Sequence, residues 1–328
     1  MYVITGGAGF IGSNVAHALA ERGARVVIVD RLRQEEKWRN LGSCDIYDIV
    51  DPGTLSDWLD RNRSEVEAVI HMGAIASTME PDVDRIAEVN FRLSCSLLTW
   101  CSQQRKRFLY ASSAATYGGG ERGFDDRDTS STALACLRPL NAYGWSKLLF
   151  DRWMMRHAEA GNLLPPQWVG LRFFNVYGPH EYHKRGMQSV IAHAYAQATS
   201  GTHIKLYRSH KQDCVDGEQR RDFVYVADCV HLVLWFLEQP RLSGLFNCGT
   251  GRARTFLDLA QAVFATLGRA MQVEFVDTPA SIRENYQYFT EANLERLRGV
   301  GYVRPFTSLE EGVDDYVRLY LAGASRYR

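Results

Sequence analysis

Ile4-Thr5-Gly6-Gly7-Ala8-Gly9-Phe10-Ile11-Gly12 follows a short apolar run and precedes a stretch, residues 13–22, with apolar side chains at helical spacing. A strand, a glycine turn and a helix in this order form the phosphate-binding start of a dinucleotide-binding fold. Gly6 permits the tight turn, Gly9 lets backbone N–H groups approach a pyrophosphate, and Gly12 lets the helix pack on the strand. The helix N-terminus adds unpaired N–H donors and a partial positive charge. This stretch therefore predicts a fold arranged around a bound dinucleotide.

A glycine-rich turn can also occur without any ligand, so the next strand decides between the two interpretations. Arg25-Val-Val-Ile-Val-Asp30 is a strand-like run that ends in an acid. The acid occupies the place where dinucleotide-binding folds carry the carboxylate that binds a ribose. The basic residues that follow, Arg31, Arg33, Lys37 and Arg39, either form a solvated loop or hold a 2′-phosphate. The dinucleotide interpretation is favoured.

The composition excludes several classes of protein. The chain has 328 residues, enough for one large or two modest domains, and its 38 basic residues balance its 38 acidic ones. No net charge favours nucleic acid or an anionic membrane as a partner. The sequence lacks the pattern of a signal peptide and any apolar run of membrane-spanning length. We therefore expect a cytoplasmic protein with no nucleic-acid or membrane partner.

The cysteines predict neither disulfides nor a metal site. There are seven, an odd number, and no pair has C-x-x-C spacing. Reduced, mostly buried thiols in a cytoplasmic protein are the expected state. The seven are Cys44, Cys95, Cys101, Cys136, Cys214, Cys229 and Cys248.

Strand-like and helix-like runs alternate through the first half of the chain. Strands are expected at 67–72, 107–111 and 168–173, and helices at 52–63, 83–104 and 142–160, with a surface loop at 119–138. This alternation predicts an α/β protein with a Rossmann-type doubly wound parallel sheet. Loops after the carboxyl ends of such strands carry ligand contacts. The glycine turn, Asp30, Gly73-Ala74 and Ser112-Ser113 should therefore meet in one crevice.

The pattern changes after residue 174. Helices are expected near 187–200, 226–238, 255–267 and 308–321, short strands near 204–207 and 272–276, and a polar loop at 210–219. We predict a dinucleotide-binding domain over residues 1–174, to which residues 226–250 return, and a smaller domain, mainly for substrate, over residues 175–328.

Tyr143 and Lys147 are the strongest catalytic candidates. They lie four residues apart in a predicted helix and so project from one face. A free phenol, with a pKa of about 10, is a poor base at neutral pH, but a nearby ammonium and a nicotinamide cation would favour the phenolate. Tyr143 would then be a usable general acid and base. On its own, a tyrosine and a lysine at this spacing would first be interpreted as a surface pair. The serine-rich strand end at Ser113 and the dinucleotide motif favour catalysis.

These motifs resemble the extended short-chain dehydrogenase/reductase family over nearly the whole chain. The resemblance rests on residues 5–12, 112–118, 143–147, 172–179 and 221–228. It implies a bound nicotinamide cofactor and a nucleotide-diphosphate sugar substrate. It also implies that Tyr143 is the acid/base, that Lys147 tunes it and that Ser113 orients the substrate.

A narrower resemblance is to the branch of this family that epimerises ADP-heptoses for the lipopolysaccharide inner core. It rests on residues 108–119, 138–151, 178–187 and 286–290. The branch implies an ADP-sugar substrate, a homo-oligomer (a pentamer in that branch) and a second acid/base at Lys184. Inversion through a planar ketone needs a proton donor on each side of the carbonyl, so one tyrosine is not enough. Without the resemblance, Lys184 would be interpreted as a solvated lysine.

The motifs and the resemblance together give two sets of binding residues. Expected cofactor contacts are Gly6, Gly9, Phe10, Ile11, Gly12, Asp30, Arg31, Lys37, Asp45, Ile46, Gly73, Ala74, Asn90, Tyr143, Lys147, Val176 and Lys184. Expected substrate contacts are Ser77, Ser113, Asn175, Gly186, His193, Tyr207, Arg208, Ser209, Arg221 and Tyr286. An arginine such as Arg221 suits a diphosphate because its planar fork donates two hydrogen bonds; the alternative is an ion pair with Asp222 or Asp228. His193 could equally be a core histidine.

The chain departs from the family pattern in four places. Pro52 stands where members carry a lysine that contacts the cofactor, and Gly186 replaces a serine that touches the sugar. Extra residues appear around 129–137 and 210–219. Cofactor choice is ambiguous, because Asp30 favours NAD while Arg31 and Lys37 favour NADP. Lys37 matches a lysine of the heptose-epimerase branch, so we expect NADP, with NAD possible.

Other readings of the same motifs are a nucleotide-sugar 4-epimerase, a 4,6-dehydratase and a reductase. A dehydratase usually has Asp-Glu after the strand-end hydroxyl, whereas Ala114-Ala115-Thr116 follow Ser113 here. A cofactor-sensing regulator without catalysis tends to lack the tyrosine–lysine pair. An epimerase is therefore the expectation.

Overall fold

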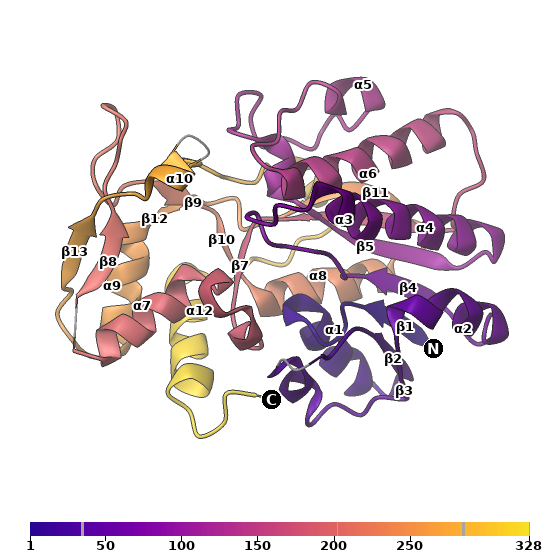
Figure 1. Cartoon of the computed structure of the whole chain (residues 1–328), viewed down its shortest axis with the longest axis horizontal. Helices are drawn as coiled ribbons and strands as arrows, with labels where there is room; N and C mark the ends of the chain where they lie inside the picture. Colours follow the sequence, from indigo (N-terminus) through magenta and orange to yellow (C-terminus); the bar gives the residue numbers. More distant parts are fainter. Residues whose placement is uncertain (34–35, 202, 284–285, 328) are drawn as a thin grey trace.

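A seven-stranded parallel sheet forms the centre of the molecule. The computed structural model describes residues 1–33, 36–201, 203–283 and 286–327. The strand order is β11-β6-β5-β4-β1-β2-β3, and every neighbouring pair is parallel. The predicted Rossmann-type fold is confirmed (Figure 1). The strands are β1 (Tyr2–Thr5), β2 (Val26–Val29), β3 (Asp48–Val50), β4 (Ala68–His71), β5 (Arg107–Ser113), β6 (Trp168–Phe173) and β11 (Gly244–Cys248).

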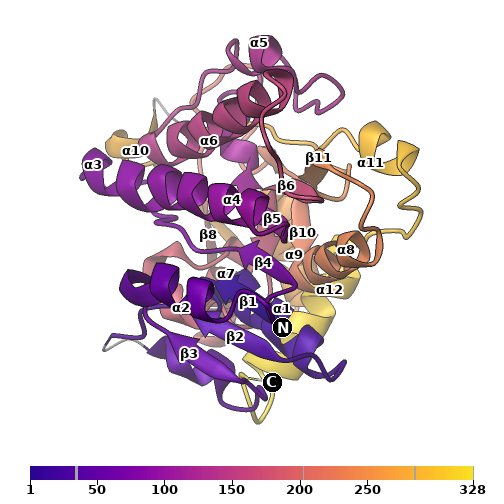
Figure 2. The ribbon, with the colours of Figure 1, turned by 90° about the vertical axis from the view of Figure 1, so that its right-hand side faces the viewer.

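Helices cover both faces of this sheet because its strands are apolar on both sides. In β1, Val3 packs into one buried cluster and its neighbour Ile4 into another. The Val3 side is covered by α2 (Leu55–Arg61), α4 (Leu93–Gln103) and α6 (Ala142–Glu159). The Ile4 side is covered by α1 (Phe10–Ala20) and α8 (Val226–Glu238), as Figure 2 shows. Strands buried on both faces read as continuous apolar runs, which is why these strands could be located from the sequence.

A third buried cluster builds a second region beside the sheet (Figure 1). Its paired short strands are β7 (Asn175–Tyr177) with β10 (Phe223–Tyr225), β8 (Ile204–Tyr207) with β13 (Val273–Val276), and β9 (Arg220–Arg221) with β12 (Arg254–Thr255). Its main helices are α7 (Val190–Thr199), α9 (Phe256–Thr266) and α12 (Leu309–Asp315). Helix α8 and strand β11 lie with the large sheet instead. The division of the chain at residue 174 stays a prediction.

The stretch at 83–104 is helical as predicted, but it is not α-helical throughout. It runs as α3 (Val83–Ile86), a π-helical turn (Ala87–Arg92) and then α4. The stretch at 308–321 likewise changes from α12 to a π-helical turn (Tyr316–Leu321). A π turn has no local sequence signature and occurs often at functional sites. The first one carries Asn90, whose side-chain contacts are described below.

The surface loop predicted at 119–138 is wrong in part. Phe124 and Asp126 are buried, and Asp126 accepts a 2.7 Å hydrogen bond from the backbone N–H of Asn247 in β11. A short helix, α5 (Ser131–Leu134), also lies in this stretch. The polar segment at 210–219 likewise ends on a buried residue, Gln219, which donates to the carbonyl of Tyr207 at 3.0 Å. The first segment thus covers a strand far away in sequence and the second folds back on the strand before it, and periodicity reveals neither role.

The remaining elements are short. They are α10 (Ala280–Arg283), α11 (Glu295–Gly299) and the 3₁₀ segments Glu36–Leu41, Pro52–Thr54, Ala114–Tyr117 and Tyr182–Met187. In the described part of the chain, every helix is too short or too polar to cross a lipid bilayer.

Candidate active site

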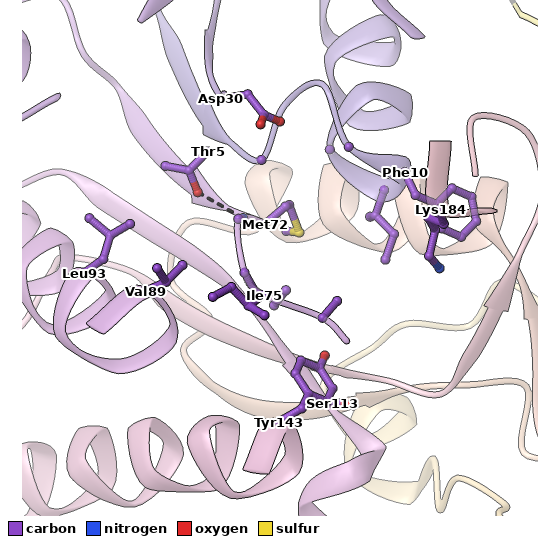
Figure 3. Close-up of a pocket in the computed structure, with 18 of the residues that line it drawn as sticks. Thr5, Phe10, Asp30, Met72, Ile75, Val89, Leu93, Ser113, Tyr143 and Lys184 are labelled. Atoms are coloured by element: carbon purple, nitrogen blue, oxygen red, sulfur yellow. Dashed lines mark hydrogen bonds between the residues drawn. The ribbon is translucent and has the colours of Figure 1, made fainter. Parts of the chain in front are cut away.

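One pocket of about 690 Å³ lies at the carboxyl ends of the central strands (Figure 3). Most of the residues expected to touch the cofactor line it, together with all four catalytic candidates and Pro52. Parallel strands of a doubly wound sheet present their loops at this edge, where ligands bind. The predicted residues that line the pocket are Gly6, Gly9, Phe10, Ile11, Gly12, Asp30, Arg31, Lys37, Gly73, Ala74, Ser113, Tyr143, Lys147, Val176 and Lys184.

The glycine turn is shaped to receive a phosphate. Gly6 has φ +63°, and a Cβ there would lie 2.6 Å from the Cα of Gly73. A Cβ on Gly12 would lie 2.2 Å from the carbonyl oxygen of Gly6. Only glycine fits these two positions without a shift of the backbone. Helix α1 begins directly after the turn and has no acidic residue in its first turn to compete for an anion. These features fit a dinucleotide.

Asp30 holds the turn and is itself neutralised. Its Oδ2 accepts a 3.0 Å hydrogen bond from the backbone N–H of Ala8, and its Oδ1 lies 2.8 Å from the Nζ of Lys37. Both side chains of this ion pair are largely buried. Arg31 is half exposed at the rim and reaches Asp51 only at 3.9 Å. The pocket is therefore lined by a carboxylate that is paired with Lys37 and by the neighbouring cation Arg31, rather than by an isolated negative charge.

Tyr143 and Lys147 come from the first two turns of α6. Asn141 caps this helix by accepting a 2.8 Å hydrogen bond from the N–H of Gly144. Burial raises the pKa of Tyr143, and a hydrogen bond with Ser113 opposes that shift. Figure 3 shows Tyr143 and Ser113 side by side at the pocket floor. The site thus holds a neutral phenol beside a serine hydroxyl, ready to donate or exchange a proton.

Lys147 is fixed behind the tyrosine. Its Nζ donates a 2.8 Å hydrogen bond to the carbonyl of Ala111, and the residue is 4 % exposed. Burial lowers the pKa of Lys147 to about 8, against the attraction of Asp151 one turn further along α6. Because the proton is held weakly, the charge of this ammonium responds to its surroundings near neutral pH.

Asp151 belongs to a fully buried ion pair under the site. Arg172 of β6 donates from Nε to the Oδ2 of Asp151 at 3.0 Å, and both side chains have zero exposure. The hydroxyls of Tyr110 and Ser112 also donate to this carboxylate, at 3.0 and 2.9 Å. Breaking a satisfied buried pair by removing one partner is costly. The pair therefore ties helix α6 to strand β6 of the central sheet.

A chain of hydrogen bonds joins the end of β1, just before the glycine turn, to helix α6. His71 lies in its middle, 2.6 Å from the hydroxyl of Thr5 and 2.9 Å from that of Ser94. Burial lowers the pKa of His71 to about 3, so the ring is neutral. The Ser94 hydroxyl donates to the carbonyl of Asn90 at 2.7 Å, which leaves the His71 Nε2–H as donor to Ser94 and Nδ1 as acceptor from Thr5.

Asn90 continues this chain from the π turn. Its amide donates to the carbonyl of Ile75 at 3.0 Å and to the hydroxyl of Ser146 at 3.0 Å, and its Oδ1 accepts from the N–H of Ile75 at 2.8 Å. The Ser146 hydroxyl donates to the carbonyl of Tyr143 at 2.7 Å. Asn90, expected to touch the cofactor, therefore holds the pocket wall and is not part of the pocket lining.

Lys184 lies on a different wall. It belongs to the 3₁₀ segment Tyr182–Met187, and its ammonium stands over the ring of Phe10 at 5.1 Å from the centroid. Burial lowers the pKa of Lys184, and Glu181 opposes this shift. Figure 3 shows Lys184 beside Phe10 and away from Tyr143, with the pocket between them. Two side chains able to exchange protons thus face one cavity from two sides.

The predicted substrate residues other than Ser113 do not line this pocket, nor do Asp45 and Ile46. Several gather in a second cluster, where Arg221 lies over the rings of Tyr286 and Phe256 at 5.4 and 5.8 Å. Tyr207 meets Tyr286 edge to face at 6.3 Å. Arg208 pairs with Asp277 at 3.4 Å. Outside both groups are Ser77, Asn175, Gly186, His193 and Ser209, of which His193 is half-buried on α7 and Gly186 is exposed.

The alternative ion pair for Arg221 is wrong. Asp222 accepts hydrogen bonds from the backbone N–H groups of Thr250 and Gly251 at 2.7 and 2.9 Å, and Asp228 accepts from that of Thr307 at 2.8 Å. Arg221 donates instead to the carbonyls of Arg220 and Gln287, and burial lowers its pKa to about 10.

Side-chain hydrogen bonds tie the segment that follows Tyr286 to residues next to the pocket lining. Gln287 donates to the carbonyl of Gly118, which follows the Ser113 strand end, and Thr290 donates to Asn175 at 3.2 Å. The sequence reasoning missed the buried supports of the site, which are Asn14, Asn40, His71, Asp151, Arg172 and Glu181. The only available signal was that polar residues occur inside apolar strands and helices.

Comparison with known proteins matches this chain to one family. The NAD dependent epimerase/dehydratase family matches residues 2–249. The chain belongs to that family. Curated members include ADP-L-glycero-D-manno-heptose-6-epimerases from Fusobacterium nucleatum, 44 % identical, and from Nitratidesulfovibrio vulgaris, 46 % identical, each over the full length of both chains.

Solved structures agree with the family assignment. The ADP-L-glycero-D-manno-heptose-6-epimerase of Helicobacter pylori superposes with a TM-score of 0.78 at 27 % identity, over 96 % of this chain and 94 % of that one. The UDP-glucose 4-epimerase of Thermus thermophilus, in complex with NAD, superposes with a TM-score of 0.73 at 26 % identity, over 96 % and 97 %. As a member of the epimerase/dehydratase family, the chain is an enzyme that works with a nicotinamide cofactor.

Proposed function

We propose that the enzyme inverts the side-chain carbinol carbon of a nucleotide-linked heptose, converting ADP-D-glycero-D-manno-heptose to ADP-L-glycero-D-manno-heptose. The observation that carries the proposal is the placement of Tyr143 and Lys184 on two walls of one pocket. A one-sided oxidoreductase needs a single proton-exchanging group, whereas inversion needs one for each face of the carbonyl. The names of the full-length relatives support the choice of sugar.

The glycine turn, Asp30 and Lys37 would hold the dinucleotide, with its pyrophosphate at the start of α1. When bound, the nicotinamide supplies reversible hydride transfer at the carbinol carbon. On one side, Tyr143 Oη would remove the hydroxyl proton when one epimer is oxidised, and would give a proton to the ketone oxygen when that epimer is formed from the other. On the other, Lys184 Nζ does the same for the second epimer. Ser113 donates to the substrate oxygen and keeps it in place.

Lys147 serves Tyr143 in this scheme through its charge. An ammonium near the phenol favours the phenolate and lowers the energy needed to remove the proton. The Ala111 carbonyl and the buried Asp151 hold Lys147 at that position without binding substrate. Arg172 in turn pairs with Asp151 in the core, at 3.0 Å.

The nucleotide end of the substrate is assigned to the second cluster. Arg221 would bind the diphosphate, since among the residues that the structure describes its buried guanidinium has no acidic partner, and such a group has unused affinity for an anion. Tyr207 and Tyr286 offer ring faces and edges for the adenine. The contacts of Gln287 and Thr290 place this cluster next to the Ser113 strand end.

NADP is the proposed form of the cofactor. Asp30 alone would repel a 2′-phosphate, but Lys37 neutralises it at 2.8 Å and Arg31 stands beside it at the rim. The protein should retain the dinucleotide through turnover, because each hydride removed is returned to the same sugar. Mass spectrometry of the small molecules released on denaturation identifies it. Release of NAD alone would contradict this part of the proposal.

The enzyme is also expected to be a homo-oligomer, and light scattering tests this expectation.

Lys184→Met tests the proposed function most economically. It should reduce epimerisation followed by NMR on the order of a hundred- to ten-thousand-fold, as expected for loss of an acid/base, with the cofactor still bound. The matched control is Lys205→Met, since Lys205 is an exposed lysine whose ion pair with Glu274 spans 3.8 Å. A rise in apparent Michaelis constant with unchanged maximal rate would instead make Lys184 a phosphate ligand. Net loss of water from the substrate would favour a dehydratase.

A further inference from the structure

Two buried asparagines join the glycine turn to the segment that carries Lys184, residues 178–188, here called the Lys184 loop. Asn14 on α1 donates to the carbonyls of Phe10 and Pro179, at 2.9 and 3.0 Å. Asn40 donates to the carbonyls of Ala8 and His180, at 2.9 and 3.1 Å. Each amide thus bridges one carbonyl at the dinucleotide turn and one in the Lys184 loop.

Both asparagine side chains are buried in the core, and each uses all of its hydrogen-bond donors. Asn14 and Asn40 are 2 % and 1 % exposed. An amide NH₂ has two hydrogens, so two carbonyl acceptors use its whole donor capacity. All four partners are acceptors, which fixes the orientation of both amides chemically. The ring of His183, another loop residue, lies 3.3 Å from the same Asn40 nitrogen.

The Lys184 loop needs such support because its backbone is unfavourable on its own. His180 and Arg185 have φ values of +75° and +50°, in the left-handed region that residues other than glycine rarely adopt. Such conformations persist where the surrounding structure imposes them. The Ser13 hydroxyl contacts His180 at 3.0 Å, and the buried Glu181 accepts from Ser189 and from Tyr316 at 3.0 Å.

We propose that Asn14 and Asn40 are positioning residues that set Lys184 against the sugar, by fastening its loop to the turn that receives the dinucleotide. This inference rests on the proposed function, since it assumes that Lys184 is an acid/base. It predicts that the placement of Lys184 depends on the glycine turn and not on α6. Loss of either amide should therefore impair the Lys184 side of the reaction and spare the Tyr143 side.

The test compares Asn14→Ala and Asn40→Ala with Lys184→Met and with Gln167→Ala. Gln167 is the matched control, because its amide is also fully buried and also bridges two carbonyls, those of Phe236 and Gln239 at 2.8 and 2.9 Å. It precedes β6, at the edge of the sheet opposite the pocket. Asn14→Ser and Asn40→Ser replace either alanine variant that fails to fold.

Two measurements are made on each variant. Backbone hydrogen exchange of the Lys184 loop, which does not depend on activity, should accelerate in both asparagine variants and stay as in the wild type in Gln167→Ala. Single-turnover reduction of bound nicotinamide is then followed from each epimer separately. The asparagine variants should slow it on the order of ten- to a hundredfold from the epimer that Lys184→Met affects, and leave the other epimer within about twofold.

The outcomes separate the two claims. If Lys184→Met is impaired while both asparagine variants match Gln167→Ala, the positioning role is overturned and the proposed function stands. Equal slowing from both epimers would also overturn it, since that is the signature of a structural defect. If Lys184→Met itself leaves both epimers unaffected, the proposed function falls, and the positioning role with it.

Discussion

The two walls of the pocket hold their proton-exchanging groups in different ways. Tyr143 stands on an 18-residue helix whose next turns carry Lys147 and the buried Asp151, so it is rooted in the central sheet. Lys184 stands on a six-residue 3₁₀ segment whose loop is held by the side-chain amides of Asn14 and Asn40 and by its own Glu181. Helix packing thus holds the proton-exchanging group on the Tyr143 wall, and hydrogen bonds from distant side chains hold the one on the Lys184 wall. Damage to the first wall should spread to the fold, and damage to the second should stay local.

The largest expected effect is that of Tyr143→Phe. The ring remains to pack on Ser113 and only the hydroxyl is lost, so the rate should fall about a hundred- to ten-thousand-fold while the melting temperature stays unchanged. Steady-state NMR assays and differential scanning calorimetry check this. Near wild-type turnover would show that Tyr143 and Lys147 are not the catalytic pair.

Arg172→Met should cost the most stability. It leaves Asp151 buried without a counter-charge, which typically costs about 3–5 kcal/mol, and urea unfolding measures the loss. The matched control is Arg22→Met, because the Arg22–Glu238 pair is 2.7 Å long but about half exposed; it should cost less than about 1 kcal/mol. Equal losses would mean that the buried pair does not root the Tyr143 wall.

Because of His71, in the hydrogen-bond chain behind Tyr143, the free energy of unfolding should decrease as the pH falls. The pKa of His71 is lowered from its usual 6.5 to about 3, so on acidification the unfolded chain takes up this proton before the native protein does. The stability from His71 is complete above pH 6.5 and is lost as the pH falls toward 3. Relative to His71→Gln, the wild type should lose about 2 kcal/mol between pH 7 and pH 5. Parallel pH profiles would contradict a buried neutral histidine.

The smallest expected effect concerns the cofactor. Lys37→Met removes the cation that neutralises Asp30, and a hydrogen bond to a charged group contributes about 1.5–3 kcal/mol. The preference for NADP over NAD should fall about tenfold or more, as titration calorimetry with each dinucleotide would show. Lys106→Met, at a lysine outside the pocket lining, serves as the control. An unchanged preference would leave Arg31 or Arg33 as the discriminating cation.

Local patterns predicted the Tyr143 wall far better than the Lys184 wall. The glycine turn, the strands and the Tyr143–Lys147 spacing are written in contiguous residues, so periodicity and motif were enough. Asn40 and His180 meet across 140 positions, and nothing near either residue signals the contact. Lys184 itself entered only through resemblance to a family, because a lysine in a polar turn has no distinguishing pattern. The π turn that carries Asn90 was missed for the same reason.

The central claim is that Tyr143 and Lys184 each serve one face of the same carbon. The most direct test mixes Tyr143→Phe and Lys184→Met, in separate experiments, with each purified epimer and follows reduction of the bound nicotinamide in a single turnover. A crossed pattern is expected, in which Tyr143→Phe blocks hydride removal from one epimer and Lys184→Met blocks it from the other. If both variants block the same epimer, or only Tyr143→Phe blocks either, two-sided acid/base catalysis is contradicted.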